Sequence, residues 1–252
     1  MTSLLVVNPN TSAEMTETIG VTALETGRRL GVEVRVICPD TGPDSIEGSF
    51  DEVVSAYWTV DCVLQVPEQF DGVLVACYGS HPAIAALREA IDVPVLGIME
   101  ASLLYALPLG AKFSIITTSP RWQPLLEESV RALGHEALCA SVRSTGLAVL
   151  DLQRLPPEQV RSRLLAEAML AVERDGAEVI VLGCAGMTGL HTAVSSIGVP
   201  VVDPVVAGVA LVAALAQTGA RTSKHNRFRR VDRRAIEYLP PGIARGYQHA
   251  RA

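Results

Sequence analysis

The chain has 252 residues, of which 49% are hydrophobic and 19% charged, and its formal net charge is −6. It is long enough for one large core or two smaller ones, and its composition excludes a fibrous or disordered protein. The negative charge disfavours a nucleic-acid partner, so we expect a small-molecule substrate.

The N-terminus, the longest apolar stretch and the cysteines predict the cellular location of the protein. Residues 1–8 carry no basic start and only four consecutive apolar residues, which does not fit a signal peptide. The longest apolar stretch, 205–216, is too short to cross a bilayer. Five cysteines without a Cys-x-x-Cys pair or a His cluster favour reduced thiols over disulfides or a metal site. We therefore predict a cytoplasmic protein with no membrane partner.

Short apolar runs alternate with longer amphipathic segments, which is typical of buried parallel strands joined by crossover helices. In chain order, the predicted strands are 4–7, 32–37, 72–76, 95–98, 113–117, 136–140, 179–182 and 201–202, and 205–216 is predicted to be a packed helix. The pattern predicts an α/β protein.

An internal repeat divides the chain. The run Val-Leu-Val-Ala-Cys ending at Cys77 is echoed by Ile-Val-Leu-Gly-Cys ending at Cys184, and a Val-Pro-Val triplet places a proline 17 and 16 residues later. Each half also opens with a strand that runs into a polar turn, at Asn8 and at Thr117, 69 and 67 residues before its cysteine. We predict two pseudo-symmetric doubly wound parallel-sheet domains with the active site in the cleft between them.

The predicted division places the first lobe, with Cys77, at 1–105 and the second, with Cys184, at 106–218. The last helix, near 205–217, is a candidate to pack back on the first lobe. Residues 219–252 form a basic C-terminal extension, with nine Lys or Arg residues against two acidic ones. We interpret the extension as a solvated segment or a subunit contact, and binding of an anionic partner is the alternative.

The two matched cysteines predict the chemistry. At the carboxyl end of a parallel strand, the N–H groups of a following helix are expected to lower a thiol pKa towards neutrality. Racemisation needs a base on one face of a carbon and an acid on the other, with the roles exchanged in the reverse reaction. Cys77 and Cys184 meet this need without a cofactor or metal, so we predict that they are catalytic. Cys38, Cys62 and Cys139 have no such equivalents and are predicted to be inert.

Substrate-binding residues are expected in the turns after the strands. Backbone amides after each cysteine, next to small residues, are expected to stabilise a carbanion beside a carbonyl. Asn8 is the preferred donor of the first turn and Thr118 of the second, although such residues also make turns and helix caps. The predicted substrate-binding residues are Asn8, Ser12, Tyr78, Gly79, Thr117, Thr118, Ala185 and Gly186.

Some residues keep two interpretations. His81 and His191 follow the two cysteines, in predicted helices, and we expect structural or solvent-facing roles, with tuning of a thiol as the alternative. Glu100 either binds substrate or caps a helix. No nucleotide-binding glycine motif and no Gly-x-Ser-x-Gly elbow occurs. A Cys-His-Asp hydrolase would leave the second cysteine unexplained.

Taken in order, these motifs resemble the Asp/Glu/hydantoin racemase superfamily and, within it, the hydantoin and allantoin racemase branch. The resemblance covers about residues 3–217 and is carried by segments 8–12, 42–48, 75–77, 97–101, 182–187 and 202–207. It implies two-thiol proton transfer at C5 of a 5-substituted hydantoin or of allantoin, substrate contacts from Asn8 and Thr118, and a homo-oligomer. Glutamate and aspartate racemases usually carry Asn-Thr after the first cysteine and Thr-His or Thr-Glu after the second. This chain has Tyr78-Gly79 and Ala185-Gly186, which favours a ring amide over an amino-acid carboxylate.

Other functions remain open at this stage. A related amino-acid racemase, a decarboxylase or a maleate-type cis-trans isomerase would use the same cysteines for another reaction. A two-lobed sensor would bind a ureide or carboxylate without converting it, but binding alone does not require two matched thiols.

Overall fold

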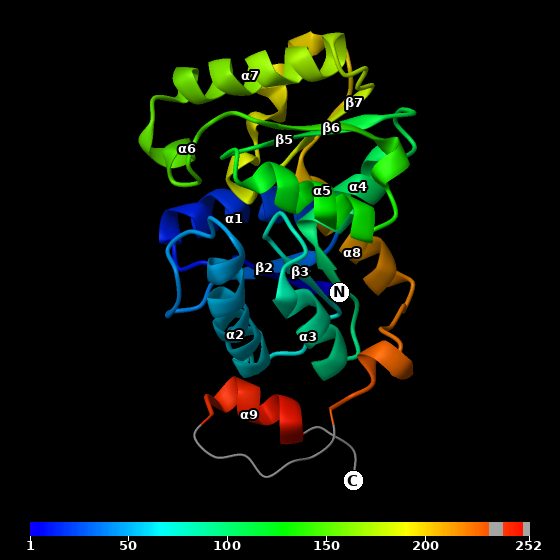
Figure 1. The fold of residues 1–252 in the computed structure, drawn as a ribbon. Coiled ribbons are helices and arrows are strands. Elements are labelled where there is room, and N and C mark those ends of the chain that lie inside the picture. The colour runs from blue at the N-terminus through cyan, green and yellow to red at the C-terminus, as the bar shows by residue number, and fades with distance from the viewer. Residues whose placement is uncertain (232–238, 249–252) are drawn as a thin grey trace.

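A computed structural model of the chain describes residues 1–231 and 239–248 (Figure 1). In this part of the chain, eight strands form two parallel sheets with the same topology, ordered β2-β1-β3-β4 and β6-β5-β7-β8. The first sheet contains β1 (Ser3–Val7), β2 (Glu33–Ile37), β3 (Gly72–Val75) and β4 (Val95–Gly97); the second contains β5 (Phe113–Thr117), β6 (Cys139–Ser144), β7 (Val179–Leu182) and β8 (Val201–Val202). The predicted fold class, two doubly wound α/β halves, is confirmed.

Helices cover the sheets in both halves (Figure 1). With the first sheet go α1 (Ala13–Leu30), α2 (Ser49–Gln65), α3 (Pro82–Ala90) and α4 (Ile98–Ala106); with the second go α5 (Trp122–Ala132), α6 (Asp151–Arg154) and α7 (Pro157–Glu173). The short 3-10 helices are η1 (Glu136–Leu138), η2 (Ala185–Met187), η3 (Leu190–Ile197) and η4 (Asn226–Phe228). None of the described helices is long and apolar enough to cross a membrane.

Helix α8 (Pro204–Gln217) follows the second sheet in sequence but packs on the first half, against α1, α4 and β3. Two glycines permit this close approach. A Cβ on Gly208 would lie 2.7 Å from the Leu74 side chain, and one on Gly72 would lie 2.4 Å from the Val212 side chain. The chain therefore crosses between the lobes twice, before β5 and before α8.

Two local predictions were wrong. Residues 136–138 form η1, and the strand predicted at 136–140 is β6, which begins at Cys139. β6 lies at the edge of its sheet and pairs with β5 alone, so polar residues such as Ser141 and Arg143 are tolerated there. Because of these residues, β6 lacks the apolar run by which the other strands were predicted. No α-helix directly follows either cysteine: α3 begins at Pro82, and Cys184 is followed by 3-10 turns.

The described parts of the C-terminal extension lie against the first lobe. Thr222 N donates to Asp92 O at 2.8 Å, and Lys224 Nζ donates to Arg88 O and Ile91 O at the end of α3, each at 2.5 Å. Helix α9 (Pro241–Gln248) packs on α2, where Ile243 N donates to the Asp61 carboxylate at 3.0 Å. Lys224 thus stabilises carbonyls at the end of α3, and Arg230 of the extension pairs with the carboxylate of Asp92 at 2.5 Å. Residues 232–238 and 249–252, with Arg233, Arg234 and Arg251, lie outside the described residues.

Candidate functional site

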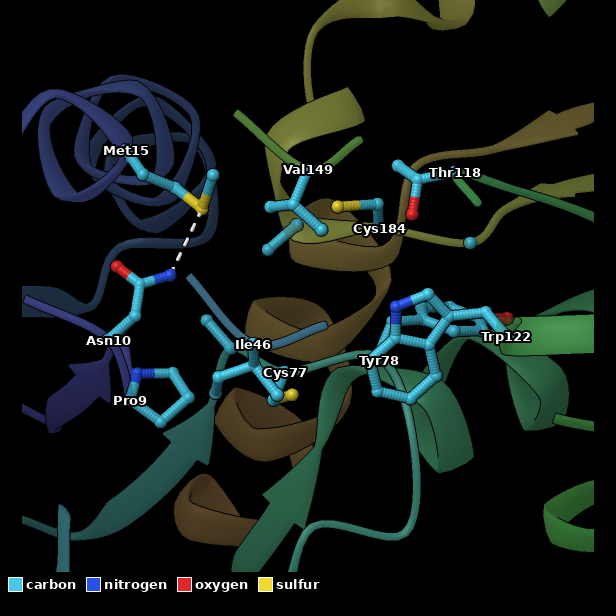
Figure 2. A pocket seen from close by; sticks show the side chains of 13 residues that line it. Pro9, Asn10, Met15, Ile46, Cys77, Tyr78, Thr118, Trp122, Val149 and Cys184 are labelled. Atoms are coloured by element: carbon cyan, nitrogen blue, oxygen red, sulfur yellow. Dashed lines mark hydrogen bonds between the residues drawn. The ribbon is translucent and has the colours of Figure 1, made fainter. Parts of the chain in front are cut away.

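A small cavity lies where the carboxyl ends of the two sheets face each other (Figure 2). Its volume is about 40 Å³, and most of its lining side chains are apolar. The lining residues are Pro9, Asn10, Met15, Ile46, Ala76, Cys77, Tyr78, Thr118, Trp122, Val149, Gly183, Cys184 and Ala185. Both lobes contribute, and each contributes one cysteine.

The two sheets present their cysteines in the same way. Beyond the end of β3, Ala76 N donates to Val7 O at 2.8 Å; beyond the end of β7, Gly183 N donates to Ile116 O at 2.8 Å. In each sheet the parallel hydrogen bonding therefore extends one residue past the strand end, and the next residue, the cysteine, lines the cavity. A Cβ on Gly183 would lie 2.9 Å from Ile116 O, so this approach requires glycine. In Figure 2 the two sulfur atoms lie on opposite walls of the cavity.

Burial controls the acidity of both thiols. Only 7% of Cys77 and 9% of Cys184 is exposed. Desolvation raises the pKa of Cys184 to about 11 and that of Cys77 well above its ordinary value. Backbone N–H groups of Gly186 and Met187 act in the opposite direction on Cys184, as that of Tyr78 does on Cys77, but they do not compensate for burial. The predicted lowering towards neutrality is wrong, because the following turns are short and both sulfur atoms are buried.

Two carboxyl groups near the N-terminus of α2 add to this effect, one for each thiol. After desolvation, Glu52 is the main charged group that raises the pKa of Cys77, and Glu47 raises that of Cys184. Partial burial also raises the pKa of each carboxyl. Glu47 Oε1 accepts a hydrogen bond of 3.0 Å from Val149 N, so its carboxylate joins the two lobes beside the cavity.

In the first polar turn, two asparagines have different positions relative to the cavity. Asn8 is fully buried, and its Nδ2 donates to Asn10 Oδ1 at 2.8 Å and to Thr16 Oγ1 at 2.9 Å. Asn10, which was not predicted, lines the cavity, and its Nδ2 contacts Met15 Sδ at 3.3 Å (Figure 2). Ser12 Oγ accepts from Met15 N and caps α1. Asn8 and Ser12 therefore shape the turn that presents Asn10.

In the corresponding turn of the second lobe, one threonine also fixes the backbone and the next lines the cavity. Thr117 Oγ1 donates to Gly183 O at 3.1 Å, which ties β5 to the strand end that carries Cys184. Thr118 lines the cavity, with its hydroxyl drawn beside Cys184 in Figure 2. Of the predicted pair, Thr118 is therefore the residue within reach of a ligand.

The residues directly after the cysteines also have distinct positions. Tyr78 and Ala185 line the cavity, and Tyr78 Oη accepts from Ser102 Oγ at 3.3 Å. Gly186 lies just outside it, where a Cβ would be 3.8 Å from Cys184 Sγ and 2.9 Å from the Leu152 side chain. Gly79 lines a neighbouring cleft instead.

The two histidines and Glu100 have structural partners. His81 caps α3, and its Nε2 lies 2.8 Å from Ser55 Oγ. His191 Nδ1 lies 3.6 Å from the carboxylate of Asp203, the N-cap of α8. Glu100 Oε1 accepts from Gly97 N at 3.0 Å and pairs with Arg88, so it caps α4. None of these three lines the cavity.

Four apolar residues of the lining were not identified from the sequence: Met15, Ile46, Trp122 and Val149. Ile46 lies in the 42–48 segment, whose placement no local pattern predicts, and Val149 comes from a connection more than 100 residues later. Trp122 begins α5, just after the second polar turn, and that position was the available signal. Among residues 1–231 and 239–248, no group of three His, Cys, Asp or Glu side chains is placed to hold a metal ion.

Comparison with known proteins agrees with this architecture. A family model described as Asp/Glu/Hydantoin racemase matches residues 4–212. The chain is 38% identical over 221 residues to a hydantoin racemase from Pseudomonas sp. (strain NS671), covering 87% of this chain and 88% of that one. The crystal structure of an allantoin racemase from Pseudomonas fluorescens matches with a TM-score of 0.87 at 37% identity, over 94% of this chain and 100% of that one. An allantoin racemase from Klebsiella pneumoniae gives the same TM-score at 35% identity, over 94% and 97%.

Proposed function

The chain belongs to the Asp/Glu/hydantoin racemase family and is a racemase; from this premise we propose that it interconverts the enantiomers of a hydantoin-like ring by two-thiol proton transfer, without a cofactor. The substrate is a 5-substituted hydantoin or allantoin, as the names of its relatives suggest. The observation that carries the proposal is the pair of buried thiols, one from each lobe, on opposite walls of one cavity (Figure 2).

In each direction one sulfur acts as base and the other as acid. A Cys184 thiolate removes the proton from C5, and the Cys77 thiol supplies a proton to the opposite face; the reverse reaction exchanges these roles. A thiolate with a high conjugate-acid pKa is a strong base towards a weakly acidic carbon, but the same raised pKa values lower the fraction of thiolate near neutral pH. Forming the thiolate in the buried site costs energy, which the N–H groups of Gly186 and Met187 partly offset on the Cys184 side.

The rest of the lining suits a neutral ring. The Asn10 amide, the Thr118 hydroxyl and the backbone at Ala185 offer hydrogen bonds to ring carbonyl and N–H groups. Among the described residues, no Lys or Arg lines the cavity, so a free carboxylate would lack a charged partner from this part of the chain. Ile46, Val149 and Trp122 form the apolar wall against which we place the ring substituent.

The test is proton NMR of single-enantiomer hydantoins and allantoin in deuterium oxide, combined with polarimetry. Wild-type protein is expected to exchange the C5 proton and abolish optical rotation. Cys77→Ser and Cys184→Ser should each lose racemisation, because one face of C5 is left without an acid or base. Each variant should still exchange the C5 proton of the one enantiomer whose proton faces the remaining cysteine. Cys139→Ser, outside the cavity, is the matched control and should racemise at the wild-type rate.

Two results would contradict the proposal. Full racemisation by either site variant would exclude the two-thiol mechanism. If wild-type protein causes neither exchange nor loss of rotation for any ring, the substrate assignment fails, and release of carbon dioxide or double-bond isomerisation becomes the reaction to measure.

A further inference from the structure

Two-thiol racemisation leaves the enzyme in a different protonation state from the one in which it began, a consequence that rests on the proposed function. After Cys184 has removed a proton and Cys77 has supplied one, the site holds a Cys184 thiol and a Cys77 thiolate. A second conversion in the same direction requires Cys77 to gain a proton and Cys184 to lose one. Both exchanges end in solvent, so a buried site needs a route for protons.

A second cleft approaches the catalytic cavity from outside, on the Cys77 side. Its volume is about 280 Å³, and Ser49, Ser80 and Glu128 on its walls are exposed, so it opens to solvent. At its inner end lies Trp122, which is 5% exposed and also lines the catalytic cavity. The cleft and the cavity are therefore separated by a shared wall.

Glu52 stands on the wall of this cleft, in the first turn of α2. Its carboxylate lies against Gly79, two residues after Cys77: a Cβ on that glycine would be 3.1 Å from Glu52 Oε1. Partial burial raises the pKa of Glu52, and the carboxylate in turn raises the pKa of Cys77.

Glu52 differs from Glu47, the carboxylate on the Cys184 side. Glu47 Oε1 is bonded to Val149 N. In the described part of the chain, no hydrogen bond or ion pair engages the Glu52 carboxylate, although its backbone oxygen accepts from Ser55 Oγ. A carboxyl that has no hydrogen-bond partner among the described residues, faces a cleft open to solvent and is electrostatically coupled to a catalytic thiol is suited to exchange protons.

We propose that Glu52 is a positioning residue that acts through Cys77 by passing protons between this thiol and water in the cleft. To return the site to its starting protonation state, the Glu52 carboxyl O–H bond breaks and the Cys77 S–H bond forms, with a water molecule from the cleft carrying the proton between the two groups, and the negative charge moves from sulfur to carboxylate. The carboxylate then takes a proton from water in the cleft, while Cys184 releases its proton to solvent. In the opposite direction, the Glu52 carboxylate accepts the Cys77 proton.

The proposal has a specific kinetic signature, because the two thiols return to their starting protonation states after product release. Glu52→Gln is expected to lower kcat in both directions by about tenfold or more, a modest part of the 10²–10⁴-fold that a positioned acid or base contributes. We expect kcat/KM to fall much less than kcat, since it does not contain the proton exchange that follows product release. Small buffer acids should restore kcat at constant pH, because they replace the lost carboxyl.

Glu128→Gln is the matched control, since Glu128 lines the same cleft but is not coupled to Cys77. It should keep wild-type kcat and show no dependence on buffer concentration. The rates are measured by polarimetry with a ring that the wild type racemises. An equal fall of kcat and kcat/KM in Glu52→Gln, or no fall at all, would overturn the proposal.

A second measurement needs no substrate. The pH dependence of Cys77 alkylation by iodoacetamide, followed by peptide mass spectrometry, should shift to lower pH in Glu52→Gln, because a negative charge beside the thiolate is removed. It should not shift in Glu128→Gln, and an unchanged Glu52→Gln profile contradicts the coupling. Failure of the proposed function itself would appear separately, as racemisation that survives Cys77→Ser.

Discussion

Single residues of this protein are governed by burial and by the few partners that burial allows. His81 is 1% exposed, its Nδ1 accepts from Ala83 N at 3.4 Å, and Nε2 lies 2.8 Å from Ser55 Oγ, which itself donates to Glu52 O. These contacts fit a neutral ring that is protonated on Nε2. Burial accordingly lowers the pKa of His81 to about 4.

This histidine predicts how stability depends on acid. Between pH 6.5, the ordinary pKa of histidine, and pH 4, His81 is protonated in the unfolded chain and neutral in the folded protein. Protons therefore favour the unfolded chain, and the free energy of unfolding falls as the pH decreases from 6.5 towards 4. Between pH 7 and pH 5, His81 should cost about 2 kcal/mol of unfolding free energy. Urea denaturation at both pH values measures this, and the loss should shrink in His81→Gln. An equally steep loss in His81→Gln would assign it to other groups.

At the scale of elements, the polar ends of helices and strands hold the site in place. Asp203, 5% exposed, caps α8 by accepting from Val205 N at 2.9 Å and Val206 N at 3.2 Å. The same carboxylate accepts from Gly189 N at 2.7 Å and from the Thr188 hydroxyl at 2.9 Å. It thereby fixes the segment after Cys184 to the helix that crosses to the first lobe.

Removing this carboxylate should therefore loosen both elements. We expect Asp203→Ala to lower the free energy of unfolding by about 2–4 kcal/mol, because a cap is lost and buried donors are left without acceptors. Asp203→Asn keeps one acceptor oxygen and should lose about half as much. Urea denaturation gives both values, and a loss in Asp203→Asn as large as that in Asp203→Ala would show that the acceptor atoms are not what stabilises this region.

At the scale of the whole molecule, the two lobes close on the site. The 46–48 segment of the first lobe reaches the second at two points: Glu47 bonds to Val149 N, and a Cβ on Gly48 would lie 2.8 Å from the Arg121 guanidinium. Ile46 and Val149 line the cavity directly at this bridge. A cavity of about 40 Å³ has room for a few water molecules and is small for a substituted ring, so we infer that this contact opens when the proposed substrate enters.

The bridge predicts a difference between two substitutions at Glu47. Glu47→Ala removes the hydrogen bond that holds the lobes together in the empty protein. Because this bond must break before the ring enters, its loss should lower KM by up to about tenfold, the lower end of what a charged hydrogen bond contributes. Glu47→Gln keeps an acceptor oxygen and should change KM far less. Both variants remove the charge that acts on Cys184, so the difference between them reports the bridge alone. Steady-state kinetics measures it, and equal KM values would contradict the role of the bond.

The sequence by itself determined what repeats locally. Buried strands that end in cysteine, polar turns at equivalent positions and the spacing between them were sufficient to predict two α/β lobes, their common topology and the catalytic candidates Cys77 and Cys184. An edge strand such as β6 was misplaced because its polar residues follow no such pattern. Helices were expected directly after the cysteines because strand-helix alternation does not reveal an irregular turn.

Only the tertiary structure decided what depends on residues distant in sequence. It brought Ile46 to Val149, placed Asn10 rather than Asn8 on the cavity, and set Glu52 beside the Cys77 turn. It also determined the direction of the thiol pKa shifts. A strand-end position favours a low pKa through backbone N–H groups, but desolvation depends on how completely both lobes cover the sulfur atoms, and that term is larger here.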